Sequence, residues 1–163
     1  MKVVSNASPL VNLARISQLT LLPQLFGRVL IPDAVWQEVV EDGRGQPGAD
    51  EIRVATWIER MSVENWQLVH SLRQDFDPGE AEAIVLAIET DADWLLMDER
   101  LGRETAAHFG LRTVGLVGLL GEAKRQGMVQ ELRPLLDQLR DVAGFWISSA
   151  LYHQVVLDAG ESS

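Results

Sequence analysis

The residues best suited to chemistry in this sequence are carboxylates and an amide that stand directly after short apolar segments. Ten of the 24 acidic residues fall in the segment 75–104. Asn6 follows the apolar run 3–4, and Asp98 follows the apolar run 94–97. Carboxylate and amide oxygens are preferred by hard divalent cations such as Mg²⁺ and Mn²⁺. A cation bound in this way can polarise a phosphoryl oxygen and generate hydroxide for attack on a phosphodiester.

Short apolar runs alternate with helical patterns along the chain, and this alternation predicts how the polar residues are positioned. The runs 3–4, 29–31, 94–97 and 112–114 have the length and composition of buried strands. Helices are predicted over 10–25, 33–40, 49–60, 78–88 and 103–109, with Gly27 as the C-cap of the first and Asp77 as the N-cap of the fourth. Most of the chain after Gly115 is also predicted to be helical, with breaks near Gly127 and Gly144. Ser148 is predicted to cap the last helix. Such alternation predicts the α/β class with a central parallel sheet.

Four polar side chains are predicted to converge at one edge of this sheet. Ligands of open parallel sheets bind at the carboxyl ends of the strands, which is where Asn6 and Asp98 stand. A helix leading into a parallel strand begins at that same edge, so Glu80 is expected near Asp98. Glu38 lies about five residues into the helix after the second strand, a rise of roughly 7–8 Å. The predicted metal ligands are therefore Asn6, Glu38, Glu80 and Asp98.

Each predicted ligand also has a purely structural interpretation. Glu80 fits a capping box with Asp77, and Asp98 fits the N-cap of the next helical turn. Glu38 fits an exposed helix residue. Asn6 fits an Asx turn with Ser8 at the end of its strand.

Other polar residues near these positions have two possible roles. Glu82 lies about 200° around the helix from Glu80, so one of the two is expected to point inward. Glu99 either supports a metal ligand from outside the coordination sphere or pairs with Arg103. The histidines have no metal-ligand spacing and are expected at the surface or in ordinary packing; they are His70, His108 and His153.

Composition and charge exclude several classes of protein. The 163 residues, 47% of them hydrophobic, predict one domain over 1–163 with a helical part from about 116. The absence of cysteine excludes a disulfide scaffold and a thiolate zinc site. No apolar run approaches the ~20 residues that span a bilayer, and the N-terminus turns polar too early for a secretory signal. We therefore expect a cytoplasmic protein with no membrane partner.

The net charge is −10, from 14 basic and 24 acidic residues. A protein that binds nucleic acid through a broad basic face has the opposite balance. An enzyme that meets phosphates through bound cations remains compatible with this charge, because the metal supplies the positive charge.

Several motifs together resemble PIN-domain proteins over nearly the whole chain. They are Val-Ser-Asn-Ala-Ser-Pro-Leu at 4–10, Ile-Pro at 31–32 with Glu38, Asp-Pro-Gly-Glu-Ala-Glu-Ala at 77–83, Leu-Met-Asp-Glu-Arg at 96–100 and Ile-Ser-Ser-Ala-Leu-Tyr at 147–152. The sequence is most similar to the toxin-type branch of PIN-like proteins. The resemblance implies an α/β/α sandwich and a Mg²⁺- or Mn²⁺-dependent ribonuclease. It also implies a homodimer and a small antitoxin protein as partner.

The resemblance also implies which residues form the site. The four acidic positions of PIN domains correspond here to Asn6, Glu38, Glu80 (or Glu82) and Asp98. Ser8 is a nearby hydroxyl, and Ser8, Glu82 and Glu99 are candidates for the surroundings of the metal. The first of the four positions is Asn6 instead of Asp, which removes one negative charge, so we expect weaker metal binding and weakened, altered or absent activity.

Three functional hypotheses follow. The first is a metal-dependent, toxin-type ribonuclease in which Arg100 or Arg103 steadies the RNA phosphate. The second is a catalytically impaired PIN-like module that acts through protein or nucleic-acid binding. The apolar side chains of Leu132, Leu135, Leu136 and Leu139 are possible partner contacts, although we expect them first in the core or at a homodimer contact. The third is a phosphatase-like hydrolase, which Asn6 disfavours because that chemistry needs a nucleophilic Asp after the first strand.

Overall fold

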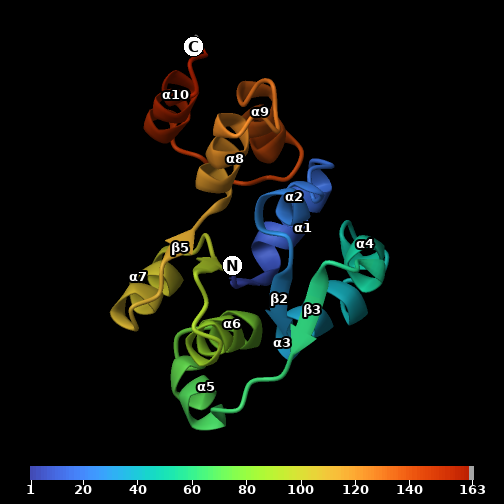
Figure 1. Ribbon diagram of the computed structural model, residues 1–163, viewed down its shortest axis with the longest axis vertical. Helices are drawn as coiled ribbons and strands as arrows, with labels where there is room; N and C mark the ends of the chain where they lie inside the picture. The colour runs from blue at the N-terminus through green and yellow to red at the C-terminus, as the bar shows by residue number, and fades with distance from the viewer. Residues whose placement is uncertain (162–163) are drawn as a thin grey trace.

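A five-stranded, all-parallel sheet forms the centre of the protein in the computed structural model, which describes residues 1–161 (Figure 1). The last two residues of the predicted domain, 162–163, lie outside the described part. The strand order is β3-β2-β1-β4-β5. The strands are β1 (Val3–Ser5), β2 (Val29–Pro32), β3 (Ile58–Met61), β4 (Trp94–Leu96) and β5 (Thr113–Val114). The first strand of the chain is thus central.

Helices cover both faces of the sheet. They are α1 (Ala7–Arg15), α2 (Leu21–Phe26), α3 (Asp33–Trp36) with the π-helical turn η1 (Gln37–Glu41), α4 (Ala49–Val54), α5 (Trp66–Leu72), α6 (Pro78–Glu89), α7 (Arg100–His108), α8 (Leu116–Arg125), α9 (Arg133–Asp141) and α10 (Ser149–Asp158). Successive β1 residues point to opposite faces, so Val3 joins one apolar cluster and Val4 the other. The first cluster contains side chains of α1 to α4 and α8 to α10, and the second those of α5 to α7. The predicted α/β/α arrangement is confirmed.

One predicted helix is too long, because tertiary pairing overrides local pattern in its second half. The helix predicted over 49–60 ends at Val54, and Ile58–Met61 forms the edge strand β3. These four residues pair in register with Val29–Pro32, while their own side chains are exposed or half-buried. The apolar run that identifies a buried strand is therefore missing. The helix α5 was not predicted either.

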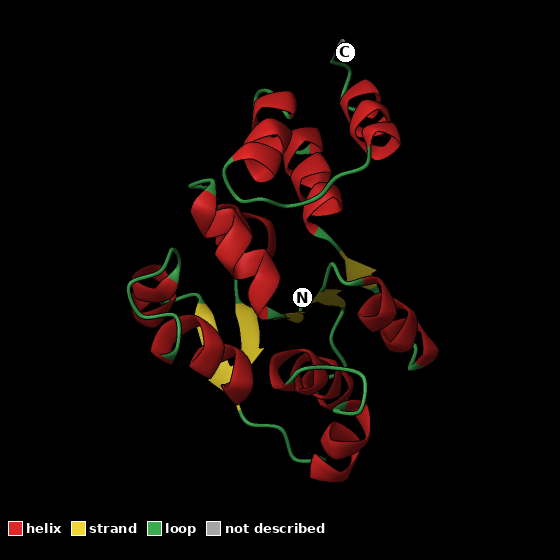
Figure 2. Ribbon diagram, turned by 180° about the vertical axis from the view of Figure 1, so that it is seen from behind, coloured by secondary structure: helices red, strands yellow, loops and turns green. Residues whose placement is uncertain are grey.

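The helix predicted over 10–25 is divided in two. Ser17 has a left-handed backbone, with φ of 58°, and this conformation separates α1 from α2. Gly27 ends α2 with φ of 77°, as its predicted role as C-cap requires. Because of the break at Ser17, α1 runs back from the carboxyl edge of the sheet as a short, straight helix, which is visible from behind in Figure 2.

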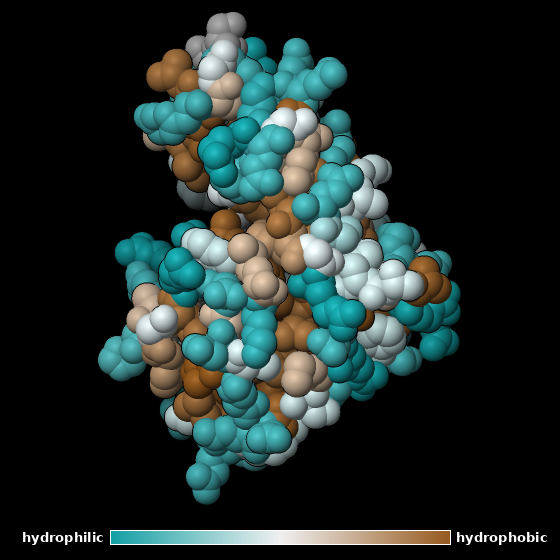
Figure 3. Space-filling view, in the orientation of Figure 1, coloured by the Kyte–Doolittle hydropathy of each residue, from teal (hydrophilic) through white to brown (hydrophobic). Residues whose placement is uncertain are grey.

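The helical part after Gly115 packs on the first apolar cluster. Gly127 and Gly144, both with positive φ, separate its three helices as predicted, and the Ser148 hydroxyl caps α10 by accepting from the Leu151 N–H. The leucines proposed as partner contacts are buried in this cluster; they are Leu132, Leu135, Leu136 and Leu139. Figure 3 shows hydrophilic side chains over most of one face, with apolar surface between the C-terminal helices and α7. Within residues 1–161, no helix is both long and apolar enough to cross a membrane.

Glu82 connects two helices that carry site residues. Its side chain is 7% exposed and accepts a hydrogen bond at 3.1 Å from the Ala34 N–H at the start of α3. Glu80, on the same helix α6, is half-buried and accepts a hydrogen bond from the Asp77 N–H instead. Of the two glutamates, Glu82 is therefore the one that points into the protein, where it supports α3 and η1.

We expect Glu82→Ala to destabilise the protein by about 1–3 kcal/mol, because it leaves the Ala34 N–H without its acceptor. Glu82→Gln keeps an acceptor oxygen and removes a desolvated charge, so its free energy of unfolding should stay within about 0.5 kcal/mol of wild type. Urea unfolding of both variants tests this. An equal loss for both variants would show that Glu82 acts through its charge instead.

Candidate active site

Asn6 stands where β1 becomes α1, at the carboxyl edge of the sheet. Its backbone N–H donates to the Leu96 carbonyl of β4 at 3.1 Å, which extends the β1–β4 pairing by one residue. It occupies the N-cap position of α1, yet its side chain makes no capping hydrogen bond. The side chain is 6% exposed and lines a polar pocket. The Asx turn proposed from the sequence would need such a local bond, so Asn6 is oriented toward the pocket instead.

This pocket, called the acid pocket below, has a volume of about 270 Å³. It is lined by Asn6, Ala7, Ser8, Val11, Asn12, Arg15, Glu38, Asp77 and Glu80. Three of the four predicted ligands are thus brought together, with Ser8 beside them, from three separate parts of the chain. Gly79 allows the close approach: a Cβ there would lie 3.1 Å from Glu38 Oε1 and 3.6 Å from Asn6 Oδ1.

Burial and like charges destabilise the ionised forms of Glu38 and Glu80 in the acid pocket. The pKa of Glu38 is raised by partial desolvation and then by repulsion from Asp77, Glu80 and Asp42. The pKa of Glu80 is raised by desolvation and by repulsion from Asp77 and Glu99, partly offset by a hydrogen bond from the Asp77 N–H. A cation among these groups would lower both pKa values.

Glu80 combines the structural role with a place in the acid pocket. Its Oε1 accepts from the Asp77 N–H at 3.0 Å, while Asp77 Oδ1 accepts from the Glu80 N–H at 2.8 Å. This is the capping box expected from the sequence, with Pro78 in the first turn of α6. The capping box fixes the direction of the Glu80 side chain, and within residues 1–161 no hydrogen bond engages its Oε2.

Asp98 follows β4 but does not line the acid pocket. Its Oδ1 accepts from the Leu116 N–H at the start of α8 at 2.8 Å, and its Oδ2 is buried without a partner in the described structure. Burial raises the pKa of Asp98, and the Leu116 hydrogen bond and Arg103 oppose this. Asp98 therefore holds α8 through one oxygen and keeps the other free.

The N-cap of α7 is Glu99, not Asp98. The Glu99 carboxylate accepts from the N–H groups of Leu101 at 3.1 Å and Gly102 at 2.8 Å. The proposed pairing of Glu99 with Arg103 is not formed, since the Arg103 guanidinium donates to the Thr113 hydroxyl.

Other polar residues lie outside the acid pocket. Arg100, like Arg103 a candidate phosphate contact, pairs with Glu104 on its own helix. All three histidines are exposed, as expected.

Sequence reasoning treated Asp77 only as a cap and did not single out Asn12 or Arg15. Asn12 and Arg15 could have been identified from their helical spacing to Ser8, because residues 8, 12 and 15 lie on one face of α1.

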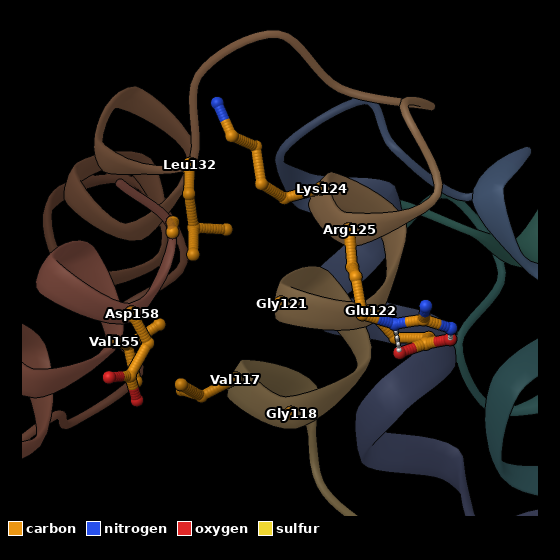
Figure 4. A pocket seen from close by; sticks show the side chains of 10 residues that line it. Val117, Gly118, Gly121, Glu122, Lys124, Arg125, Leu132, Val155 and Asp158 are labelled. Carbon is orange, nitrogen blue, oxygen red and sulfur yellow. Dashed lines mark hydrogen bonds and ion pairs between the residues drawn. The ribbon is translucent and has the colours of Figure 1, made fainter. Parts of the chain in front are cut away.

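A larger cavity, of about 410 Å³, lies between α8 and α10 (Figure 4). Its walls combine the small residues Gly118 and Gly121 with apolar side chains such as Val155. The acidic Glu122 at its rim is hydrogen-bonded to Arg125, and this pair holds the pKa of Glu122 at about 2. The other carboxylate that lines this cavity, Asp158, accepts a hydrogen bond from Gln154 Nε2 at 2.8 Å, so the cavity has two partnered carboxylates and lacks the donor set of the acid pocket.

Comparison with known protein families assigns the chain to one of them. A family model described as a PIN domain matches residues 2–161. The chain belongs to the PIN-domain family. No curated protein matches it. The PIN domain is a nuclease fold whose members are usually metal-dependent ribonucleases.

The oxygen atoms at this edge of the PIN domain are of the chemical type that a hard cation prefers as ligands. The acid pocket contains an amide oxygen and several carboxylates, and Asp98, just after the neighbouring strand β4, adds a buried oxygen without a partner in the described structure. In residues 1–161, no three His, Asp or Glu side chains are close enough to hold an ion as they stand. Binding would therefore require Glu38, Glu80 and Asp98 to move toward one another.

Gly115→Ala should displace Asp98. A Cβ at Gly115 would lie 2.6 Å from Asp98 Oδ1, so the carboxylate must shift and weaken its hydrogen bond to Leu116. We expect a loss of about 1–3 kcal/mol in the free energy of unfolding, measured in urea. Gly121→Ala is the matched control on α8, since a Cβ there meets nothing within 4 Å. If both variants have wild-type stability, Asp98 is not confined as described.

Glu38→Gln should stabilise the metal-free protein at neutral pH by a few tenths of a kcal/mol, since it removes a repelled, partly exposed charge. A raised carboxyl pKa destabilises the fold above that pKa and has no effect below the ordinary value of 4.5. The gain in melting temperature should therefore vanish as the pH falls through the raised pKa of Glu38 toward 4.5. The exposed Glu131→Gln is the control, and a gain independent of pH would contradict the repulsion argument.

Proposed function

We propose that this PIN domain is a metal-dependent ribonuclease of the toxin type that hydrolyses RNA phosphodiester bonds. The observation that supports this best is the acid pocket. There Asn6, Glu38 and Glu80, from three elements, share one cavity at the carboxyl edge of the sheet. The raised pKa values of Glu38 and Glu80 fit a site whose charge is balanced by a bound cation.

In this proposal Mg²⁺ or Mn²⁺ is held by Asn6, Glu38, Glu80 and Asp98. Such a cation polarises a phosphoryl oxygen and makes bound water more acidic. Glu38 lines the acid pocket, and a carboxylate oxygen that is not bound to the cation is suited to accept a proton from the attacking water. Glu99 lies close enough to Glu80 to raise its pKa, so it strengthens the attraction for a cation from outside the ligand set.

Ser8 is suited to orient the phosphate. Its hydroxyl oxygen accepts from Asn12 Nδ2 at 3.0 Å, which leaves the hydroxyl proton available to a phosphate oxygen in the acid pocket. Ser8 thus contributes a neutral donor within a group of carboxylates. This arrangement lets the phosphate approach without adding another negative charge.

The amide at Asn6 favours a second candidate function, a catalytically impaired module that binds protein or nucleic acid. An amide oxygen can ligate a cation but contributes no charge, so the affinity for metal falls. In either case the proposed partners are RNA, a small antitoxin and a second copy of the chain. A basic antitoxin would complement the net charge of −10.

Titration of metal-stripped protein with Mn²⁺ by calorimetry tests the proposal. We expect binding in wild type, its loss in Asp98→Asn, and affinity about tenfold higher in Asn6→Asp, which restores a charged ligand. Glu131→Gln, remote in sequence and exposed, should bind like wild type. RNA cleavage should follow the same order and stop in EDTA.

The two candidate functions give different results in this titration. No binding at millimolar Mn²⁺ in wild type, with binding in Asn6→Asp, would support the impaired module. No binding in either protein would reject the metal site. Cleavage of RNA that persists unchanged in EDTA would reject the metal-dependent mechanism.

A further inference from the structure

One face of α1 is polar and extends from the acid pocket toward solvent. Ser8, Asn12 and Arg15 lie on this face at helical spacing, and all three line the acid pocket. Ser8 is half-buried, Asn12 is buried and Arg15 is exposed, so the face opens toward solvent along the helix. In Figure 2, α1 runs from the sheet toward the segment that joins α9 to α10.

Arg15 joins these two regions. Its Nη1 donates at 3.3 Å to the carbonyl of Ala143, which lies in the segment between α9 and α10. Within residues 1–161, Arg15 has no carboxylate at ion-pair distance, and it is the basic side chain among those lining the acid pocket. A guanidinium has five N–H donors, so most remain available. Planar paired donors of this kind match a phosphate.

Trp146 stands three residues beyond the carbonyl that Arg15 contacts. Its side chain is 82% exposed, more than any other large apolar side chain in the described part of the chain. Its neighbours Phe145 and Ile147 pack against the first apolar cluster, which directs the indole outward. Three residues span at most about 10 Å, so the indole stays near the Arg15 end of α1.

An arginine with free donors beside an exposed indole has the composition of a site for single-stranded nucleic acid. Aromatic rings stack on bases of any sequence, and arginine contacts the phosphates between them. A duplex keeps its bases stacked inside and offers none to Trp146. The net charge of −10 gives this protein no general attraction for phosphate, so a localised cation and a stacking ring can set where a strand enters.

We propose that Arg15 and Trp146 guide single-stranded RNA into the acid pocket. Arg15 binds a phosphate next to the one that enters the pocket, and Trp146 stacks on the base of a flanking nucleotide. The choice of RNA rests on the proposed function, but the binding itself needs no hydrolysis. The two residues are binding residues, and the carboxylates perform the chemistry.

Fluorescence anisotropy with a labelled single-stranded RNA of about 12 nucleotides tests this, in EDTA and again with Ca²⁺. We expect Trp146→Ala to weaken binding about tenfold, and Trp146→Phe to retain most of it. Arg15→Gln should weaken binding and lower the slope of log affinity against log salt by about 0.7, the value for one lost phosphate contact. Arg15→Lys should keep the slope.

Matched controls are Arg28→Gln, whose residue precedes β2 at the opposite edge of the sheet, and Trp66→Ala, whose indole is exposed on α5. Both should bind like wild type. The proposal is overturned if Arg15 and Trp146 variants bind like the controls, if a duplex binds as tightly as the single strand, or if wild type binds RNA in neither buffer. Unchanged melting temperatures establish that each variant is folded.

The result also separates this proposal from the proposed function. RNA binding that depends on Arg15 and Trp146, in a protein that binds no Mn²⁺, would support RNA binding by these two residues and reject the proposed ribonuclease. Metal-dependent cleavage of RNA at the same rate in the Arg15 and Trp146 variants would support the proposed ribonuclease and reject RNA binding by these two residues. If Trp146→Ala instead alters only self-association, the indole contacts a second copy of the chain and RNA binding by these two residues is rejected.

Discussion

The parallel pairing of β1 with β4 is the constraint on which the rest of the site depends. Ser5 is in register with Leu96, and the next N–H, that of Asn6, still donates to the Leu96 carbonyl. This places two chain segments that are about ninety residues apart in sequence at one edge of the sheet. A shift of the register by one residue would turn every side chain of β1 to the other face. The side chain of Asn6 would then point away from the face that carries the acid pocket.

The carboxylates at this edge are held together by hydrogen bonds that also build the fold. Glu80 belongs to the capping box of α6, Glu99 caps α7, and Asp98 holds the start of α8. Each acid therefore has a structural reason to be where it is, even though burial raises the pKa of Glu80 and of Asp98 and repulsion from nearby carboxylates adds to the effect on Glu80. The helix N-termini supply the positive ends that offset part of this repulsion. Structural and chemical roles are combined in the same side chains.

Much of the arrangement could be predicted from the sequence, because it depends on strand ends and helix starts. The capping box Asp77–Glu80 and the position of Asn6 after the first strand follow from local pattern alone. The orientation of Asp98 does not, since its partner Leu116 is 18 residues away and the contact depends on Gly115 lacking a side chain. The strand β3 was missed because its neighbour β2, not its own composition, makes it a strand.

Charge determines how an acidic protein of this kind could meet RNA at all. With a net charge of −10 it has no general attraction for phosphate, so any attraction must be local. The acid pocket can attract phosphate after a cation has neutralised its carboxylates, whereas Arg15 carries its charge at every physiological pH. Arg15 contacts Ala143 and lines the acid pocket. Its permanent positive charge therefore lies beside a pocket that attracts phosphate only after a metal cation has bound. Binding that requires both would confine cleavage to strands already held at Trp146.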